Sequence, residues 1–243
     1  MKTLVVGASG ATGKLLVEHL LKAGQQVKAI VRPSSNIPDS WNNNNNNNLT
    51  VIRSNIAQIA VDDMAKLLAD CQAVASCLGH NLTLKGIYGK PRKLVTDTVR
   101  LLCEAALKLK PEKPLKLVLM NTAGNSNRDL NEPISTRHKF MLSLIRLFVP
   151  PHSDNENAAD YLRVNIGKQN KHINWVAVRP DTLINEAEVT EYTLHNSPTR
   201  SALFNPGKTS RINIAHFVLQ LFADDETWIK WKGQMPVIYN VEK

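Results

Sequence analysis

The stretch that decides the fold is VVGASGATGK, residues 5–14 of this 243-residue chain. Its glycines, Gly7, Gly10 and Gly13, are three residues apart, whereas the classical dinucleotide fingerprint has spacings of two and three. The stretch joins an apolar run (residues 2–6) to a segment with apolar residues at helical spacing (14–23). We expect Gly7 to allow the tight turn, Gly10 the approach of a pyrophosphate, and Gly13 close packing of helix on strand. Because a helix start offers free amides to an anion, the stretch predicts a dinucleotide-binding turn rather than a plain strand-to-helix connection.

The rest of the chain alternates between two patterns. Short apolar runs predict strands at 26–31, 49–53, 73–78, 115–120, 173–178 and 237–239, and helical spacing predicts helices at 62–69 and 94–109. Residues 33–48, with two prolines and the asparagine run 42–48, are interpreted as a surface loop. Strands that alternate with helices indicate parallel pairing with helices on both faces. We therefore expect one α/β domain over 1–243, a doubly wound parallel sheet in three α/β/α layers.

Composition restricts the class of protein. A hydrophobic content of 43% supports a packed core, and no apolar run reaches 18 residues; the longest, 140–149, is too short to span a membrane and contains Arg146. The N-terminus lacks the apolar region of a signal peptide, and the three cysteines have no CxxC spacing. We therefore expect a cytoplasmic protein with no membrane partner and no metal site.

The net charge of +9 leaves the ligand class open. The 30 lysines and arginines are scattered and aromatic residues make up 5%, whereas a nucleic-acid binder concentrates its basic residues on one surface. We expect a small-molecule substrate and no nucleic-acid partner. A basic cluster after the fourth predicted strand is either surface charge or an attraction for an anionic ligand, and comprises Lys85, Lys90, Arg92 and Lys93.

The residues at the end of the second predicted strand indicate whether NAD or NADP is preferred. An NAD site places a carboxylate there, but between Lys14 and Asp39 the only acid is Glu18, inside the first helix. Arg32, Ser34 and Ser35 stand there instead. A guanidinium pairs with a 2′-phosphate and two hydroxyls add donors, which favours NADP over NAD; the alternative is that Arg32 is a solvated charge.

Five segments together resemble the atypical short-chain dehydrogenase/reductases: GASGATGK, VRPSS, Ser76-Cys77-Leu78-Gly79, Met120-Asn121-Thr122-Ala123 and Val178-Arg179-Pro180. Among these, the chain is most similar to the NAD(P)H-binding group that includes NmrA-like proteins and the biliverdin and flavin reductases. The resemblance implies a Rossmann-like domain that binds NADP along the carboxyl ends of the strands. It implies these contacts: Gly7, Ser9, Gly10, Ala11, Thr12 and Gly13 with the pyrophosphate; Arg32 with the 2′-phosphate; Asn55 and Ile56 with adenine; Cys77, Leu78 and Gly79 with ribose; Thr122 and Pro180 with nicotinamide.

The Tyr-x-x-x-Lys pair of the better-known relatives is missing. The literal match, Tyr239 to Lys243, lies far beyond the relevant helix. That helix is predicted to begin at Ser153, because Ser153 and Glu156 form a capping box, and the resemblance then puts Pro151 and Asn155 at the tyrosine and lysine positions.

Other side chains must therefore assist catalysis, if the protein is an enzyme. Thr122 is the first candidate for polarising a substrate carbonyl, and His152 for donating a proton; His80 is a further candidate. The alternatives are a hydroxyl that serves only its own loop and histidines that are solvated.

The expected function is an NADP-dependent oxidoreductase that transfers a hydride to a small carbonyl, quinone or flavin-like acceptor. The substrate pocket is expected from segments 124–152 and 181–210. Because the tyrosine–lysine pair is missing, a non-catalytic NADP-binding regulatory or sensor protein of NmrA-like type is the alternative.

Overall fold

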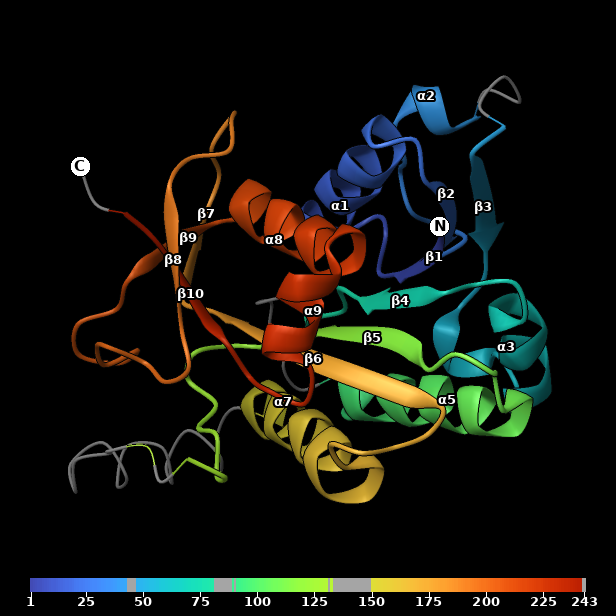
Figure 1. The fold of residues 1–243 in the computed structure, drawn as a ribbon. Coiled ribbons are helices and arrows are strands. Elements are labelled where there is room, and N and C mark those ends of the chain that lie inside the picture. The colour runs from blue at the N-terminus through green and yellow to red at the C-terminus, as the bar shows by residue number, and fades with distance from the viewer. Residues whose placement is uncertain (43–46, 81–88, 90, 131, 133–149, 242–243) are drawn as a thin grey trace.

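The computed structural model describes residues 1–42, 47–80, 89, 91–130, 132 and 150–241. Within them, one sheet of eight strands has the order β3-β2-β1-β4-β5-β6-β10-β8 (Figure 1). All neighbours pair in parallel except β8, which is antiparallel to β10. The strands are β1 (Lys2–Val6), β2 (Gln26–Val31), β3 (Leu49–Arg53), β4 (Ala73–Ser76), β5 (Leu115–Met120), β6 (Ile173–Pro180), β8 (Tyr192–His195) and β10 (Val237–Asn240); β7 (Thr182–Ile184) and β9 (Lys208–Ser210) form a separate parallel pair.

Helices cover both faces of this sheet (Figure 1). One face carries α1 (Ala11–Lys22), α2 (Asp39–Asn42), α8 (Arg211–Ala223) and α9 (Asp225–Trp231). The other carries η1 (Ile56–Gln58), α3 (Val61–Leu68), α5 (Leu94–Leu109), α7 (Pro150–Asp160) and its π-helical continuation η2 (Tyr161–Ile166). Successive residues of a strand point to opposite faces, so Leu4 and Val6 pack in one core and Val5 in the other. The sheet is thus buried on both sides, and the expected three-layer, Rossmann-like architecture is confirmed.

Two local predictions are wrong. Residues 33–48 are not all loop, because α2 places Trp41, only 6% exposed, against the core on the α1 side. A single large aromatic residue anchors this short helix, so no apolar period marks it. The helix predicted from Ser153 begins at Pro150, because proline, which lacks an amide donor, is suited to a first helical turn. Ser153 therefore lies inside α7.

Some predictions concern residues outside the described parts of the chain. These are the asparagines at 43–46, Lys85, Lys90, segment 140–149, Lys243 and most of the expected pocket segment 124–152. Among the helices that are described, none is long and apolar enough to cross a membrane.

The strand order fixes where a ligand can bind. Going outward from β1, the chain runs to β2 and β3 on one side and to β4 and β5 on the other. In doubly wound sheets this reversal leaves a crevice at the carboxyl ends of the strands, and the glycine-rich turn after β1 lies there.

Candidate functional site

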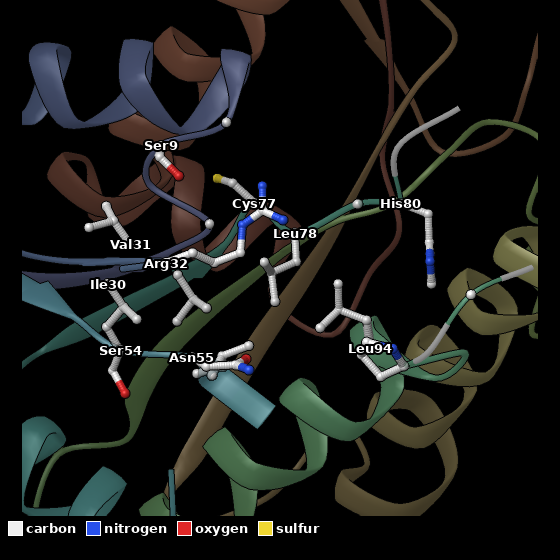
Figure 2. A pocket seen from close by; sticks show the side chains of 17 residues that line it. Ser9, Ile30, Val31, Arg32, Ser54, Asn55, Cys77, Leu78, His80 and Leu94 are labelled. Atoms are coloured by element: carbon white, nitrogen blue, oxygen red, sulfur yellow. The ribbon is translucent and has the colours of Figure 1, made fainter. Parts of the chain in front are cut away.

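A cavity of about 450 Å³ lies at this reversal point. Its described lining comes from the ends of β1 to β4 and the start of α5: Val6, Gly7, Ser9, Gly10, Ile30, Val31, Arg32, Ser54, Asn55, Ile56, Cys77, Leu78, Gly79, His80, Gly89, Pro91 and Leu94. In Figure 2, Ser9, Arg32 and Asn55 lie on one side of it, and His80 and Leu94 on the other. The volume is in the range of small-molecule sites.

The glycine-rich turn has no room for side chains. Gly7 has φ +75°, and a Cβ there would lie 3.0 Å from backbone atoms of Cys77 and Leu78. A Cβ on Gly13 would lie 2.3 Å from the carbonyl oxygen of Gly7 and 2.9 Å from Cα of Ala8. At Gly10 the same distance to the Gly7 oxygen is 3.2 Å. The close packing expected of Gly13 is therefore present, and the turn stays open toward the cavity.

The start of α1 offers free backbone donors. Gly10 is the N-cap residue and provides no side-chain cap. The amide of Gly10 donates to the Gly7 carbonyl and that of Lys14 to Gly10, whereas the amides of Ala11, Thr12 and Gly13 have no acceptor among the described residues. Three unpaired amides at the positive end of a 12-residue helix form a site for an anion such as a pyrophosphate.

Two arginines, Arg32 and Arg53, lie near the end of β2. Arg32 is exposed and lines the cavity, and no aspartate or glutamate belongs to the described lining. The adjacent loop is held in two ways. The Ser9 hydroxyl donates to the Ser35 hydroxyl (3.0 Å), and Nη1 of Arg53 lies 3.3 Å from the carbonyl oxygens of both Pro33 and Ser35. Sequence reasoning missed Arg53, which the pairing of β2 with β3 places opposite Val31.

The remaining lining residues include two with structural roles. Asn55 accepts a hydrogen bond from the Ala57 amide (3.3 Å) and so caps η1, while Ile56 is buried in the core. Burial raises the pKa of the Cys77 thiol to about 12, so this cysteine stays protonated and weakly nucleophilic at neutral pH.

Nine predicted cofactor residues line the cavity: Gly7, Ser9, Gly10, Arg32, Asn55, Ile56, Cys77, Leu78 and Gly79. The other predicted residues lie outside the described lining: Ala11, Thr12, Gly13, Ser34, Ser35, Thr122, Pro180 and His152. Ala11 to Gly13 still belong to the turn, and Ser35 contacts Ser9.

Thr122 and His152 come together at the end of β5. Gly124 separates them, and a Cβ there would lie 3.6 Å from Oγ1 of Thr122 and 3.5 Å from Cε1 of His152. Thr122 Oγ1 accepts from the Gly124 amide (3.2 Å), and its own proton makes no hydrogen bond to a described residue. Nε2 of His152 is 3.4 Å from a Glu156 carboxyl oxygen. Pro180 accepts from the Ala123 amide and so lies beside this loop.

A second histidine is paired more closely. Nε2 of His80 lies 2.7 Å from Oδ2 of Asp154 on α7, and their side chains are 5% and 1% exposed. The same carboxylate accepts from the amides of Val95 and Thr96 and from the Thr96 hydroxyl. Asp154 was missed by sequence reasoning, since 74 residues separate it from His80.

The Val-Arg-Pro motif has a structural role. Arg179 is fully buried and all five of its N–H groups are bonded: to the carbonyl oxygens of Met235, Asn125 and Asn196 and to both carboxylate oxygens of Glu132. Arg179 thus ties the loop after β5 to β6 and to the chain before β10.

At the two positions that resemble those of the missing tyrosine–lysine pair, the structure has Pro151 and Asn155. Pro151 is buried in the first turn of α7, and the Asn155 carbonyl accepts from the Asn121 side chain (2.9 Å). Tyr239 is a buried residue of β10.

Comparisons with known proteins agree with this geometry. The profile of the NAD(P)H-binding family matches residues 7–225. No match was found among curated proteins. Similar solved structures include the oxidoreductase ylbE from Lactococcus lactis (TM-score 0.69, 17% identity, covering 100% of this chain and 92% of that one). Another is a short-chain dehydrogenase/reductase from Veillonella parvula in complex with NADP (0.68, 13%, 98% and 94%). A third is ChuY, an anaerobillin reductase from Escherichia coli O157:H7 (0.67, 15%, 100% and 98%). By the extent of the profile match, this chain belongs to the NAD(P)H-binding family.

Proposed function

We propose that this protein is an NADP-dependent oxidoreductase that transfers a hydride to a small carbonyl, quinone or flavin-like acceptor. The observation that carries the proposal is the glycine turn opening onto a cavity whose described lining contains Arg32 and no carboxylate. When bound, the dinucleotide supplies the hydride, and the protein supplies orientation and a dry pocket.

The residues around the turn fit such a cofactor. The amides of Ala11, Thr12 and Gly13 would hold the pyrophosphate, and Arg32 the 2′-phosphate. Arg53 would hold the 33–35 loop in place and add a second positive charge. At the other end, the Thr122 hydroxyl would donate a hydrogen bond to a substrate carbonyl and so polarise it. The names of the similar reductases support this class of reaction.

Binding measurements test the cofactor. We expect tighter binding of NADPH than of NADH, and we expect Arg32→Ala to weaken NADPH at least tenfold while leaving NADH nearly unchanged, since a charge-assisted hydrogen bond contributes about 1.5–3 kcal/mol. Arg53→Ala should weaken NADPH to a smaller extent. Arg128→Ala, on a surface arginine paired with Asp160, is the matched control and should change neither. Equal losses for both cofactors in Arg32→Ala would contradict the NADP assignment.

Turnover measurements test the activity. NADPH oxidation with a quinone, flavin or aldehyde supports the oxidoreductase. The missing tyrosine–lysine pair favours one other candidate, an NADP-binding sensor, and tight binding without turnover across the whole panel would support it instead.

A further inference from the structure

We infer that His80 is the proton donor of the proposed reaction, and that Asp154 is the positioning residue that holds its imidazole. The inference rests on the proposed function. The proton-transfer role thus falls to His80, which follows β4, with its partner Asp154 on α7, and not to His152.

The carboxylate of Asp154 is fixed before it meets the histidine. It reaches from α7 to the start of α5, where it accepts from the amides of Val95 (2.8 Å) and Thr96 (3.0 Å) and from the Thr96 hydroxyl (2.6 Å). These bonds cap a helix whose N-cap residue, Lys93, provides no side-chain cap. With three donors already in place, the carboxylate cannot rotate freely, and its contact with His80 has a fixed direction.

That contact fixes which ring nitrogen is available. Because the Asp154 carboxylate already accepts three bonds, Nε2 of His80 donates to it, at 2.7 Å. Nδ1 makes no hydrogen bond to a described residue and remains for a ligand. The carboxylate thereby orients the imidazole ring, as in other carboxylate–histidine pairs.

The strand order places His80 at the reactive end of the cavity. Arg32 follows β2, the glycine turn follows β1, and His80 follows β4 on the other side of β1. A dinucleotide with its 2′-phosphate at Arg32 and its pyrophosphate at α1 would extend its nicotinamide toward His80, opposite Arg32 and Asn55 in Figure 2.

His152 is less suited to this role. It lies outside the described lining, and its Nε2, 3.4 Å from a Glu156 carboxyl oxygen, is buried without a hydrogen bond to a described residue. Among the described lining residues, His80 carries the side chain type that changes charge between pH 5 and 8. Charged groups on the described elements next to it include Asp154 and Glu156 on α7, Arg92, Lys93 and Asp97 at the start of α5, and Arg32 across the cavity.

The step balances with NADPH as the reductant. The acceptor gains a hydride at carbon or nitrogen, and a proton moves from Nδ1 of His80 to the acceptor atom that takes up negative charge. The Nδ1–H bond breaks, an O–H or N–H bond forms, and the neutral imidazole regains a proton from water.

His80→Gln tests the inference, with His172→Gln as the matched control, because His172 directly precedes β6 and does not belong to the described lining. Glutamine keeps an N–H donor for Asp154 but carries no transferable proton. We expect kcat to fall about 100-fold or more, because general acid catalysis typically contributes at least that factor. The kcat of the wild type should decline as the pH rises, and the kcat of His80→Gln should not. The Kd of NADPH should stay within twofold, and the control should keep wild-type kcat. In ¹⁵N NMR spectra of the wild type, the neutral imidazole of His80 should carry its proton on Nε2.

Three results would overturn the inference: a wild-type kcat and pH profile in His80→Gln, a loss of NADPH affinity as large as the loss of kcat, or a neutral imidazole of His80 that carries its proton on Nδ1. Turnover that is unaffected by His80→Gln would refute the inference alone. If the wild-type protein turned over no acceptor, the proposed function and the inference would fail together.

Discussion

The glycine turn gives a prediction that the structure makes quantitative. In Gly13→Ala, the new Cβ would lie 2.3 Å from the carbonyl oxygen of Gly7, whereas real Cβ contacts do not fall below 3.0 Å. The backbone must therefore separate by about 3.0 − 2.3 = 0.7 Å. Because the contacted atoms belong to the backbone, no side-chain rotation can relieve the overlap. The movement must displace the turn that faces the cavity.

Two opposing effects set the size of the stability change. Alanine in place of glycine favours a helix by about 1 kcal/mol, and overpacking in a tight contact costs about 1–3 kcal/mol or more. Because backbone atoms cannot rotate away, we take the upper end of the overpacking cost and expect Gly13→Ala to lower the free energy of unfolding by about 2 kcal/mol, or Tm by about 4–8 °C for a chain of this size. Because the moved turn carries the amides proposed to hold the pyrophosphate, NADPH affinity should fall at least tenfold, about the loss of one charge-assisted hydrogen bond.

Thermal denaturation and NADPH titration measure both effects. Gly10→Ala is the graded comparison, because its Cβ would lie 3.2 Å from the same oxygen and needs a shift of only a few tenths of an ångström. Its Tm should stay close to that of the wild type. A Gly13→Ala protein with unchanged Tm and unchanged NADPH affinity would refute the packing argument.

The buried ion pair, two facing histidines and the cavity cysteine give further expected outcomes. Glu132→Gln leaves the buried charge of Arg179 without its partner, 2.7 Å away, and should cost about 3–5 kcal/mol in denaturant unfolding; a cost under 1 kcal/mol would contradict this. Burial lowers the pKa of His19 and His216, so the folded state binds fewer protons and stability should fall as the pH drops below about 6.5. His216→Asn should reduce that fall, measured as urea midpoints at pH 5 and 7.5. With its pKa raised to about 12, Cys77 should react slowly with iodoacetamide at pH 7, and rapid labelling detected by mass spectrometry would contradict its burial.

The sheet was predictable from the sequence because its strands are buried on both faces. Such strands are continuous apolar runs, and runs like VAVRP in β6 stand out without any knowledge of their neighbours. The edge strand β8 did not stand out, since its four residues are only partly buried and are defined by antiparallel pairing with β10. Its assignment depends on contacts about 45 residues apart, which no local pattern encodes.

The helices α8 and α9 were missed although local signals exist. Ser210 accepts from the Asn213 amide and Asp224 from the Thr227 amide, and both residue types are typical N-caps. These caps could have located the helix starts. The apolar pattern of α8 is harder to interpret because buried residues surround it, among them Phe217 and Val218, so no single stripe marks its inner face.

The residues of the candidate site also form two groups, those that the sequence could predict and those that it could not. The glycine turn and Arg32 could be predicted because a local motif and a strand end position them. Arg53 and Asp154 could not, because each acts across the fold: Arg53 on a loop 18 to 20 residues earlier, and Asp154 on groups 58 to 74 residues earlier. A single sequence shows which residues are polar but does not show which of them meet.

The helix α7 explains how the chain can keep the cofactor side of the fold without the tyrosine–lysine pair. At the two positions that resemble those of the pair stand Pro151, buried in the first turn, and Asn155, whose carbonyl holds Asn121. The residue beside Asn155 is Asp154, and its carboxylate points to the start of α5 and to His80. A carboxylate with three fixed donors orients an imidazole more firmly than solvent could. If His80 donates the proton, α7 still positions the donor, but through a carboxylate and a histidine that follows β4. The cofactor contacts proposed at the ends of β1 and β2 need no change for this, since they lie on the other side of the sheet reversal.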